Sequence, residues 1–189
     1  MKNKNIALIT TADVGNESEA IRQSLEYFGF TLYTRYIGRP DDFINILSGG
    51  DPIANLSHYW IFSSHGEEAA FLMPELAPEL YLPDEIQAPI DAQHIRQSAK
   101  LNGQTILATG CTLGELSLAQ AFLNSRANAY IGSTDYVEGN TALLFIIRFF
   151  YEIANGNTEI EAFETAQKMD EETLLFECYL SMSENKHPT

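Results

Sequence analysis

A cysteine at position 111 and a histidine at position 65 are the residues whose types and settings suit nucleophilic chemistry. A thiol becomes a good nucleophile once it is deprotonated, and a nearby imidazole can take its proton and later protonate a leaving amine. Small residues surround both side chains, in the words SSHG and TGCT. His65 alone would be interpreted as a turn residue, and Cys111 alone as a small buried thiol. Together they predict a His–Cys dyad for acyl transfer.

Both residues follow short apolar runs typical of buried strands. Tyr59–Ser63 (YWIFS) precedes His65, and Thr105–Ala108 (TILA) precedes Cys111. The segment Asp91–Leu101 between them has the pattern of a helix, with an aspartate as its N-cap. Strand, crossover helix and strand form a right-handed unit whose two strands are neighbours. Ligands bind beyond the carboxyl ends of such strands, so both side chains are predicted at one edge of the sheet.

The remaining segments continue the alternation of strand and helix. Strands are predicted at Ile6–Thr10, Phe30–Ile37 and Ala129–Gly132, and helices at Glu17–Phe28, Pro40–Leu47, Leu113–Leu123, Asn140–Ala154 and Thr158–Met169, the last with a capping box of Thr158 and Glu161. The less regular stretch 67–89 is expected to hold a short hairpin near Ala69–Met73. This order predicts an α/β fold, a mainly parallel sheet with helices on both faces, in three layers.

Two backbone N–H groups beside the dyad are candidates for an oxyanion hole. Gly66 lets the N–H of the histidine turn face a substrate carbonyl, and the N–H of Cys111 is the second candidate donor. We expect Cys111 at the start of the helix Leu113–Leu123, where the helix N-terminus would favour the thiolate.

The sequence resembles the caspase-like clan of cysteine peptidases, which includes caspases, gingipains and separases. The blocks YWIFSSHG and TILATGC match the clan's apolar strands that end in His-Gly and in Cys. The 46 residues from position 65 to position 111 are close to the roughly 50 of caspases. GCTLGELSLAQAFLNSRANAYIGST is similar to gingipain-type members, and FFYEIANGNTEIEAFETAQ resembles the clan's final helices. The likeness extends from Ile6 to about Met169.

The resemblance implies a caspase-like fold and a cysteine peptidase, with Cys111 as nucleophile and His65 as general acid and base. It also implies a charged residue in the pocket for the substrate side chain before the cleaved bond. Asp135 and Glu138, after the last parallel strand, are candidates, with solvated loop acids as the alternative interpretation. Asp13, after the first strand, is a candidate for orienting His65. The caspase word Gln-Ala-Cys is absent, so a caspase proper with Asp specificity is not indicated.

The composition of the chain limits the classes of molecule that it is expected to bind. The net charge is −15, with 26 acidic and 11 basic residues, and such a surface repels nucleic acid. Two cysteines and four scattered histidines make neither a disulfide framework nor a zinc motif, so no metal and no cofactor are expected. A peptide or protein is the expected substrate.

The length suits one domain, predicted over residues 1–182, with a polar flexible tail at 183–189. The apolar run Ile6–Ile9 is too short for a secretory or membrane-spanning segment, which favours a cytoplasmic protein without membrane contact. An edge of the sheet could support a homodimer.

Two other functions stay open. The chain could be a non-catalytic caspase-like scaffold that works through protein contacts, although it retains both His65 and Cys111. It could also be a flavodoxin-like binding module, because TTADVGNESEA after the first strand faintly resembles a phosphate-binding hydroxyl loop. The residues favour the cysteine hydrolase.

Overall fold

The computed structural model describes residues 5–11 and 13–181, so the predicted tail at 183–189 lies outside the described residues. The strands are β1 (Asn5–Thr11), β2 (Thr31–Ile37), β3 (Tyr59–Ser63), β4 (Gly66–Glu67), β5 (Ala70–Phe71), β6 (Thr105–Ala108), β7 (Ala129–Ser133) and β8 (Phe176–Leu180). The helices are α1 (Glu17–Tyr27), α2 (Pro40–Leu47), α3 (Pro52–Leu56), α4 (Ala92–Ser98), α5 (Leu116–Asn124), α6 (Gly139–Ala154) and α7 (Glu159–Gln167), with 3₁₀ turns η1 (Pro78–Leu80) and η2 (Thr173–Leu175).

The central sheet has the strand order β2-β1-β3-β6-β7-β8, and β4 and β5 form a separate hairpin. Strands β1, β2, β3, β6 and β7 pair in parallel, and β8 joins the edge of β7 in the antiparallel direction. Strands β3 and β6 are direct neighbours, with Phe62 opposite Ala108. The predicted adjacency of the two strands is therefore confirmed.

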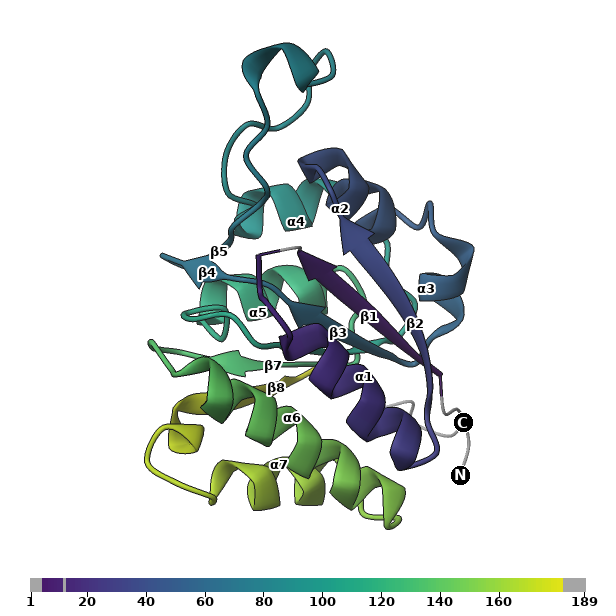
Figure 1. Ribbon diagram of the computed structural model, residues 1–189, viewed down its shortest axis with the longest axis vertical. Coiled ribbons are helices and arrows are strands. Elements are labelled where there is room, and N and C mark those ends of the chain that lie inside the picture. Colours follow the sequence, from purple (N-terminus) through teal and green to yellow (C-terminus); the bar gives the residue numbers. More distant parts are fainter. Residues whose placement is uncertain (1–4, 12, 182–189) are drawn as a thin grey trace, which may run out of the picture.

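Helices cover both faces of this sheet (Figure 1). Alternate residues of each strand point to opposite faces, so Ala7 and Ile9 of β1 join the core under α2, α3, α4 and α5. Ile6 and Leu8 join the core under α1, α6 and α7. Strands buried on both faces explain why the apolar runs lack a polar alternation. The three-layer α/β architecture predicted from the sequence is confirmed.

Several local predictions differ from the structure. Helix α3 and strand β8 were not predicted, because a five-residue helix and a five-residue edge strand carry too few positions for a periodic pattern. Tertiary contacts hold α3 in place: the indole Nε1 of Trp60 donates a hydrogen bond of 2.8 Å to the carbonyl of Ala54. Helix α5 begins at Leu116, three residues later than predicted.

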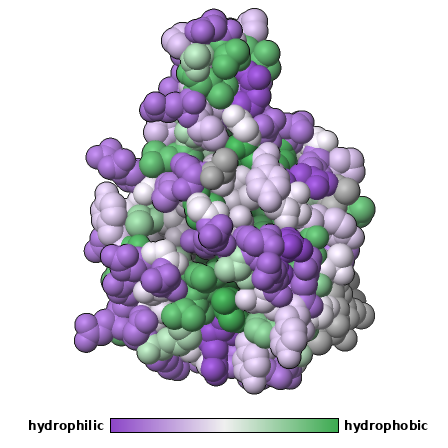
Figure 2. Space-filling model, in the orientation of Figure 1, coloured by the Kyte–Doolittle hydropathy of each residue, from purple (hydrophilic) through white to green (hydrophobic). Residues whose placement is uncertain are grey.

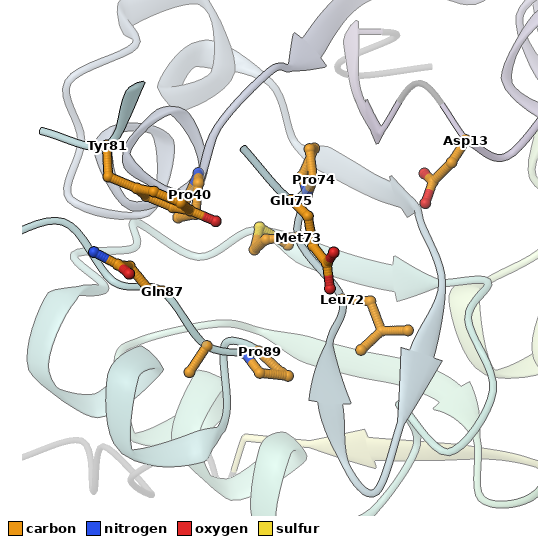
Figure 3. Close-up of a pocket in the computed structure, with 10 residues that line it drawn as sticks. Asp13, Pro40, Leu72, Met73, Pro74, Glu75, Tyr81, Gln87 and Pro89 are labelled. Atoms are coloured by element: carbon orange, nitrogen blue, oxygen red, sulfur yellow. The ribbon is translucent and has the colours of Figure 1, made fainter. Parts of the chain in front are cut away.

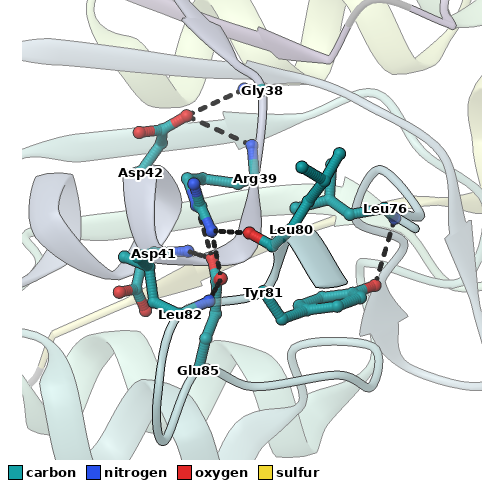
Figure 4. Close-up of polar contacts among 9 residues, drawn as sticks. All are labelled: Gly38, Arg39, Asp41, Asp42, Leu76, Leu80, Tyr81, Leu82 and Glu85. Carbon is teal, nitrogen blue, oxygen red and sulfur yellow. Dashed lines mark hydrogen bonds and ion pairs between the residues drawn. The ribbon is translucent and has the colours of Figure 1, made fainter. Parts of the chain in front are cut away.

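Residues 73–89, here called the arm, project from the body beyond α2 and α4 (Figure 1). Its tip is partly apolar, with Leu80 and Leu82 exposed, as the space-filling view shows (Figure 2). Glu85 fixes the arm, because its buried carboxylate accepts two hydrogen bonds from the Arg39 guanidinium, of 2.9 and 2.6 Å, and others from the backbone N–H groups of Asp41 and Leu82 (Figure 4).

Helices long and apolar enough to cross a membrane are absent from the described residues.

Candidate active site

The loops that follow β3 and β6 carry the two residues expected to do chemistry. His65 lies two residues after the end of β3, and Cys111 lies three residues after the end of β6. The strands are parallel neighbours, so both residues lie at the carboxyl edge of the sheet. This is the edge at which sequence analysis placed them.

Two glycines bring these loops into direct contact. A Cβ atom added to Gly110 would lie 2.5 Å from the carbonyl oxygen of Ser64 and 2.8 Å from the backbone nitrogen of Gly66. A Cβ atom added to Gly66 would overlap the carbonyl oxygen of Cys111. Real side chains do not fit at such distances, so the approach of the histidine and cysteine loops requires glycine at both positions.

His65 is exposed, and backbone groups of two neighbouring segments contact it. Its Nε2 lies 3.4 Å from the carbonyl oxygen of Asp13 in the loop after β1. A carbonyl only accepts hydrogen bonds, so this contact requires a proton on Nε2, and Nδ1 is then the basic nitrogen of the neutral ring. The carbonyl of His65 accepts a hydrogen bond of 3.1 Å from the N–H of Leu72. Asp13, the candidate for orienting His65, thus contacts the ring through its main-chain carbonyl.

Cys111 is half-buried in a turn rather than at a helix start. Its Sγ lies 3.6 Å from the carbonyl oxygen of Val137, in the loop before α6, and donates a weak hydrogen bond to it. Helix α5 begins five positions later, at Leu116, so the prediction of a helix N-terminus at Cys111 is wrong. The close passage of Gly114 against the carbonyl of Gly132 explains the delay, because the chain must clear β7 before it can coil.

Neighbouring loops fix the cysteine turn from two sides. Thr112 adopts a left-handed conformation, with a φ of 57°, which is uncommon for a β-branched residue. Its side-chain oxygen accepts a hydrogen bond of 3.1 Å from the N–H of Ala69, in the β4–β5 hairpin. Its own N–H donates to the carbonyl of Asp135, at 3.2 Å. Backbone strain held by surrounding contacts is typical of functional sites.

The two acidic candidates take different positions. Glu138 precedes α6 and lines a cavity of about 400 Å³ between the starts of α1 and α6, here called the α6 cavity. Asp135 is exposed, and its carboxylate accepts a hydrogen bond of 2.7 Å from the N–H of Tyr136. The carbonyl of Asp135, through Thr112, supports the cysteine turn.

Glu17, the first residue of α1, lies at this edge of the sheet but was not among the predicted site residues. Its Oε1 accepts hydrogen bonds from the hydroxyl groups of Ser63, at 2.7 Å, and Thr109, at 2.8 Å. These two residues stand side by side where β3 and β6 end, and Glu17 also lines the α6 cavity beside Glu138. A signal was present: hydroxyl residues at corresponding places after two apolar runs suggest a shared polar partner.

Within the described residues, no three or more His, Cys, Asp and Glu side chains are grouped so that they could hold a metal ion.

No protein-family model matches this sequence, and neither does any curated protein. Solved structures do match. The Arg-specific cysteine proteinase gingipain R, the RgpB of Porphyromonas gingivalis, has a TM-score of 0.58 at 14% identity, over 92% of this chain and 44% of that chain. Separase of Saccharomyces cerevisiae, in complex with securin, has a TM-score of 0.59 at 12% identity, over 93% of this chain and 12% of that chain.

A secreted C11 cysteine protease from Bacteroides thetaiotaomicron, solved with an irreversible peptide inhibitor, has a TM-score of 0.53 at 12% identity. The match covers 87% of this chain and 57% of that chain. This chain therefore spans less than two thirds of the length of each of these proteins. The likeness confirms the fold of the caspase-like cysteine peptidases that sequence analysis predicted.

Proposed function

We propose that this protein is a cysteine peptidase of the caspase-like type, in which Cys111 and His65 act as a dyad on a peptide bond. The contact between their loops, through Gly66 and Gly110, is the observation that supports the proposal most strongly. The shared fold with cysteine proteases agrees with it. A scaffold without catalysis would not need two glycines to hold a histidine loop against a cysteine loop.

The proposed reaction begins with proton transfer from the Cys111 thiol to His65. The thiolate sulfur then attacks the substrate carbonyl carbon, and the new C–S bond gives a tetrahedral intermediate with a negative oxygen. We propose the backbone N–H groups of Gly66 and Cys111 as the donors to that oxygen. The C–N bond breaks as the imidazolium of His65 gives its proton to the leaving amine.

Water completes the cycle. It attacks the thioester while His65 takes one of its protons, and the second tetrahedral intermediate collapses with cleavage of the C–S bond. The proton returns from His65 to the sulfur, and a carboxylic acid leaves. The net change is hydrolysis of one amide bond into an acid and an amine.

We propose that the α6 cavity receives the side chain that precedes the cleaved bond. Glu17 and Glu138 line it, and Glu138 follows Val137, whose carbonyl contacts the Cys111 sulfur. Two carboxylates favour a basic side chain. Asp135 stays a second candidate for this role, because it lies in the same loop as Val137. A homodimer and a cytoplasmic location also stay predictions.

Digestion of a peptide library prepared from a whole proteome tests the function. Mass spectrometry should find new peptide ends with the wild-type chain, with Arg or Lys enriched just before the cut. The Cys111→Ala variant should generate no such ends while keeping the circular dichroism spectrum of the wild type. Equal cleavage by the variant would assign the activity to another residue or to a contaminant, and no cleavage by either would favour the scaffold.

A further inference from the structure

A second cavity adjoins the other member of the dyad. It holds about 330 Å³ between the base of the arm, the start of α2 and the loop after β1 (Figure 3), and is here called the arm cavity. Two of its lining residues contact His65 directly. Asp13 offers its carbonyl to Nε2, and Leu72 donates its N–H to the carbonyl of His65. A substrate that crosses the dyad therefore meets this cavity on the histidine side.

The lining combines two carboxylates with apolar walls. Asp13 and Glu75 are acidic, Leu72 and Met73 are apolar, and Tyr81 adds an aromatic ring. Figure 3 shows both carboxylates directed toward the side of the cavity where Leu72 lies. No basic residue is among those that line it. The chemistry suits a side chain with an apolar stem and a positive end, since the stem can lie on the walls while the cation faces the carboxylates.

Arg39 is the basic residue closest along the chain to a residue that lines the cavity, Pro40. Its positive charge is already neutralised. Its guanidinium binds both oxygens of Glu85 and the carbonyl of Leu80 (Figure 4). The hydrogen bonds from Arg39 hold the pKa of Glu85 at about 2, so the pair stays ionised at every physiological pH. This pair, in which the Glu85 side chain is buried and that of Arg39 is partly exposed, also fixes the arm against α2, so the cavity wall is formed before any ligand arrives.

The loop after β1 contributes to both cavities, through Asp13 and Val14, but the helices that line them cover opposite faces of the sheet. The α6 cavity is formed by α1 and α6, which cover one core, whereas the arm cavity includes the start of α2, which covers the other. Val137, which precedes the α6-cavity residue Glu138, contacts Cys111, whereas Asp13 of the arm cavity contacts His65. In the proposed reaction His65 protonates the leaving amine, so the residues after the cleaved bond lie on its side.

We infer that the arm cavity binds a lysine or arginine side chain of the substrate, within the first residues after the cleaved bond. This inference rests on the proposed function. It gives the arm a role in substrate selection, because Glu75 and Tyr81 come from the arm itself. A peptide with basic residues on both sides of the cut would then fill both cavities.

Matched peptides test this inference. A sequence cleaved by the wild-type chain is made with Arg or with norleucine at each of the first three positions after the cut, and kcat/KM is measured for each peptide. The Arg form should be preferred about tenfold at one position. Glu75→Gln should reduce this Arg-to-norleucine ratio about threefold, and Glu75→Gln combined with Asp13→Asn should remove most of it, as expected for partly exposed ion pairs.

Glu79→Gln is the control, because Glu79 lies exposed on the same arm and does not line the cavity. The same loss in the Glu79 and Glu75 variants would assign the preference to the general field of the acidic surface and overturn the inference. So would an equal kcat/KM for the Arg and norleucine peptides. If the wild type cleaves nothing, the proposed function fails. The binding of labelled Arg and norleucine peptides to the Cys111→Ala variant, measured by fluorescence anisotropy, then tests the arm cavity by itself. Weaker binding of the Arg peptides to Cys111→Ala/Glu75→Gln supports the cavity, and equal affinity for both peptide types in Cys111→Ala overturns it.

Discussion

The two ends of the parallel sheet each carry a histidine, and the two histidines have opposite settings. At the carboxyl end, His65 and Cys111 lie in loops, and their side-chain contacts are long ones to backbone carbonyls, of 3.4 and 3.6 Å. At the amino end, His58 binds the carboxylate of Glu159 at 3.1 Å. The second cysteine, Cys178, lies in the middle of the edge strand β8, opposite Ile131 of β7. The carboxyl end thus combines a histidine with a cysteine, whereas the histidine of the amino end is paired with a carboxylate.

The two ends differ in whether their polar side chains already have strong hydrogen-bond partners. The Glu159 carboxylate also accepts hydrogen bonds from the Thr105 hydroxyl, at 3.2 and 3.1 Å. Burial alone would raise the pKa of Glu159, but the hydrogen bonds from His58, Tyr59 and Thr105 more than offset it, and the net shift is downward. Such a cluster stabilises the fold, because each polar side chain in it has a hydrogen-bond partner. A histidine and a cysteine become reactive where loops leave them half-open.

The largest contrast is expected between the two histidines. His65→Ala should lower kcat/KM for peptide cleavage by about three orders of magnitude, the usual contribution of a general acid and base. His58→Ala should leave kcat/KM within a factor of two, because His58 binds Glu159 at the far end of the sheet. Steady-state assays with one fluorogenic peptide give both values. A similar loss in both variants would mean that the amino end supports catalysis.

The next contrast concerns the glycines. Gly110→Ala should reduce kcat/KM about 100-fold, because the new Cβ would push the two loops apart and a shift of about 1 Å at a reacting group has that effect. Gly38→Ala is the control, since an added Cβ there would make only an ordinary contact, 3.5 Å from Asp42 Oδ2. The assay is run at a temperature at which both variants remain folded by circular dichroism. Full activity in Gly110→Ala would show that contact between the loops is not required.

Much of the carboxyl edge was predictable because it depends on order along the chain. Apolar runs fixed β3 and β6, and the helix between them made them parallel neighbours, which placed His65 and Cys111 at one edge. Ser63 and Thr109 suggested that those loops share a polar partner, but the identity of that partner was not predictable. Glu17 contacts Ser63 and Thr109 across distances of 46 and 92 residues along the chain, and no local pattern encodes such a contact.

The contacts of the arm were equally hard to predict from local sequence. Its four prolines indicated an irregular segment, but nothing local indicated that Glu85 would be buried and would pair with Arg39, 46 residues away. The left-handed Thr112 was also hidden, because a β-branched residue is a poor sequence signal for that conformation. The late start of α5 has a similar origin, in the contact of Gly114 with β7.

The two cysteines offer a smaller contrast that needs no substrate. Burial, together with the nearby charges of Glu159 and Glu177, raises the pKa of Cys178 to about 11. Its thiolate fraction therefore falls tenfold for each pH unit below that value, and alkylation by iodoacetamide at pH 7.5 should be slow. Cys111 should be labelled at least about 30-fold faster, as followed by mass spectrometry of tryptic peptides.

Labelling of Cys178 should rise steadily up to about pH 11. The Cys178→Ala variant, assayed in parallel, should keep the labelling rate of Cys111 and the peptidase activity. Faster labelling of Cys178 than of Cys111 at pH 7.5 would reverse the assignment of the reactive thiol.

The smallest effect is expected at Glu159. A carboxyl group whose pKa is lowered by folding contributes stability above its unfolded pKa, roughly 4.3, and that contribution is lost as the pH falls through the lower folded value. Glu159→Gln should therefore reduce the free energy of unfolding by about 1 kcal/mol at pH 7, and the difference from the wild type should shrink below about pH 4. Urea denaturation across this range measures it.

Glu164→Gln is the matched control on the same helix. The Glu164 carboxylate lies 3.9 Å from Lys168 with both side chains exposed, and such a surface pair contributes little to stability. Peptidase activity should be unchanged in both variants, because neither residue is near the carboxyl edge. A Glu159 variant that keeps its stability but loses activity would show that the two ends of the sheet are coupled, and the amino-end cluster would then be part of the working machinery rather than its support.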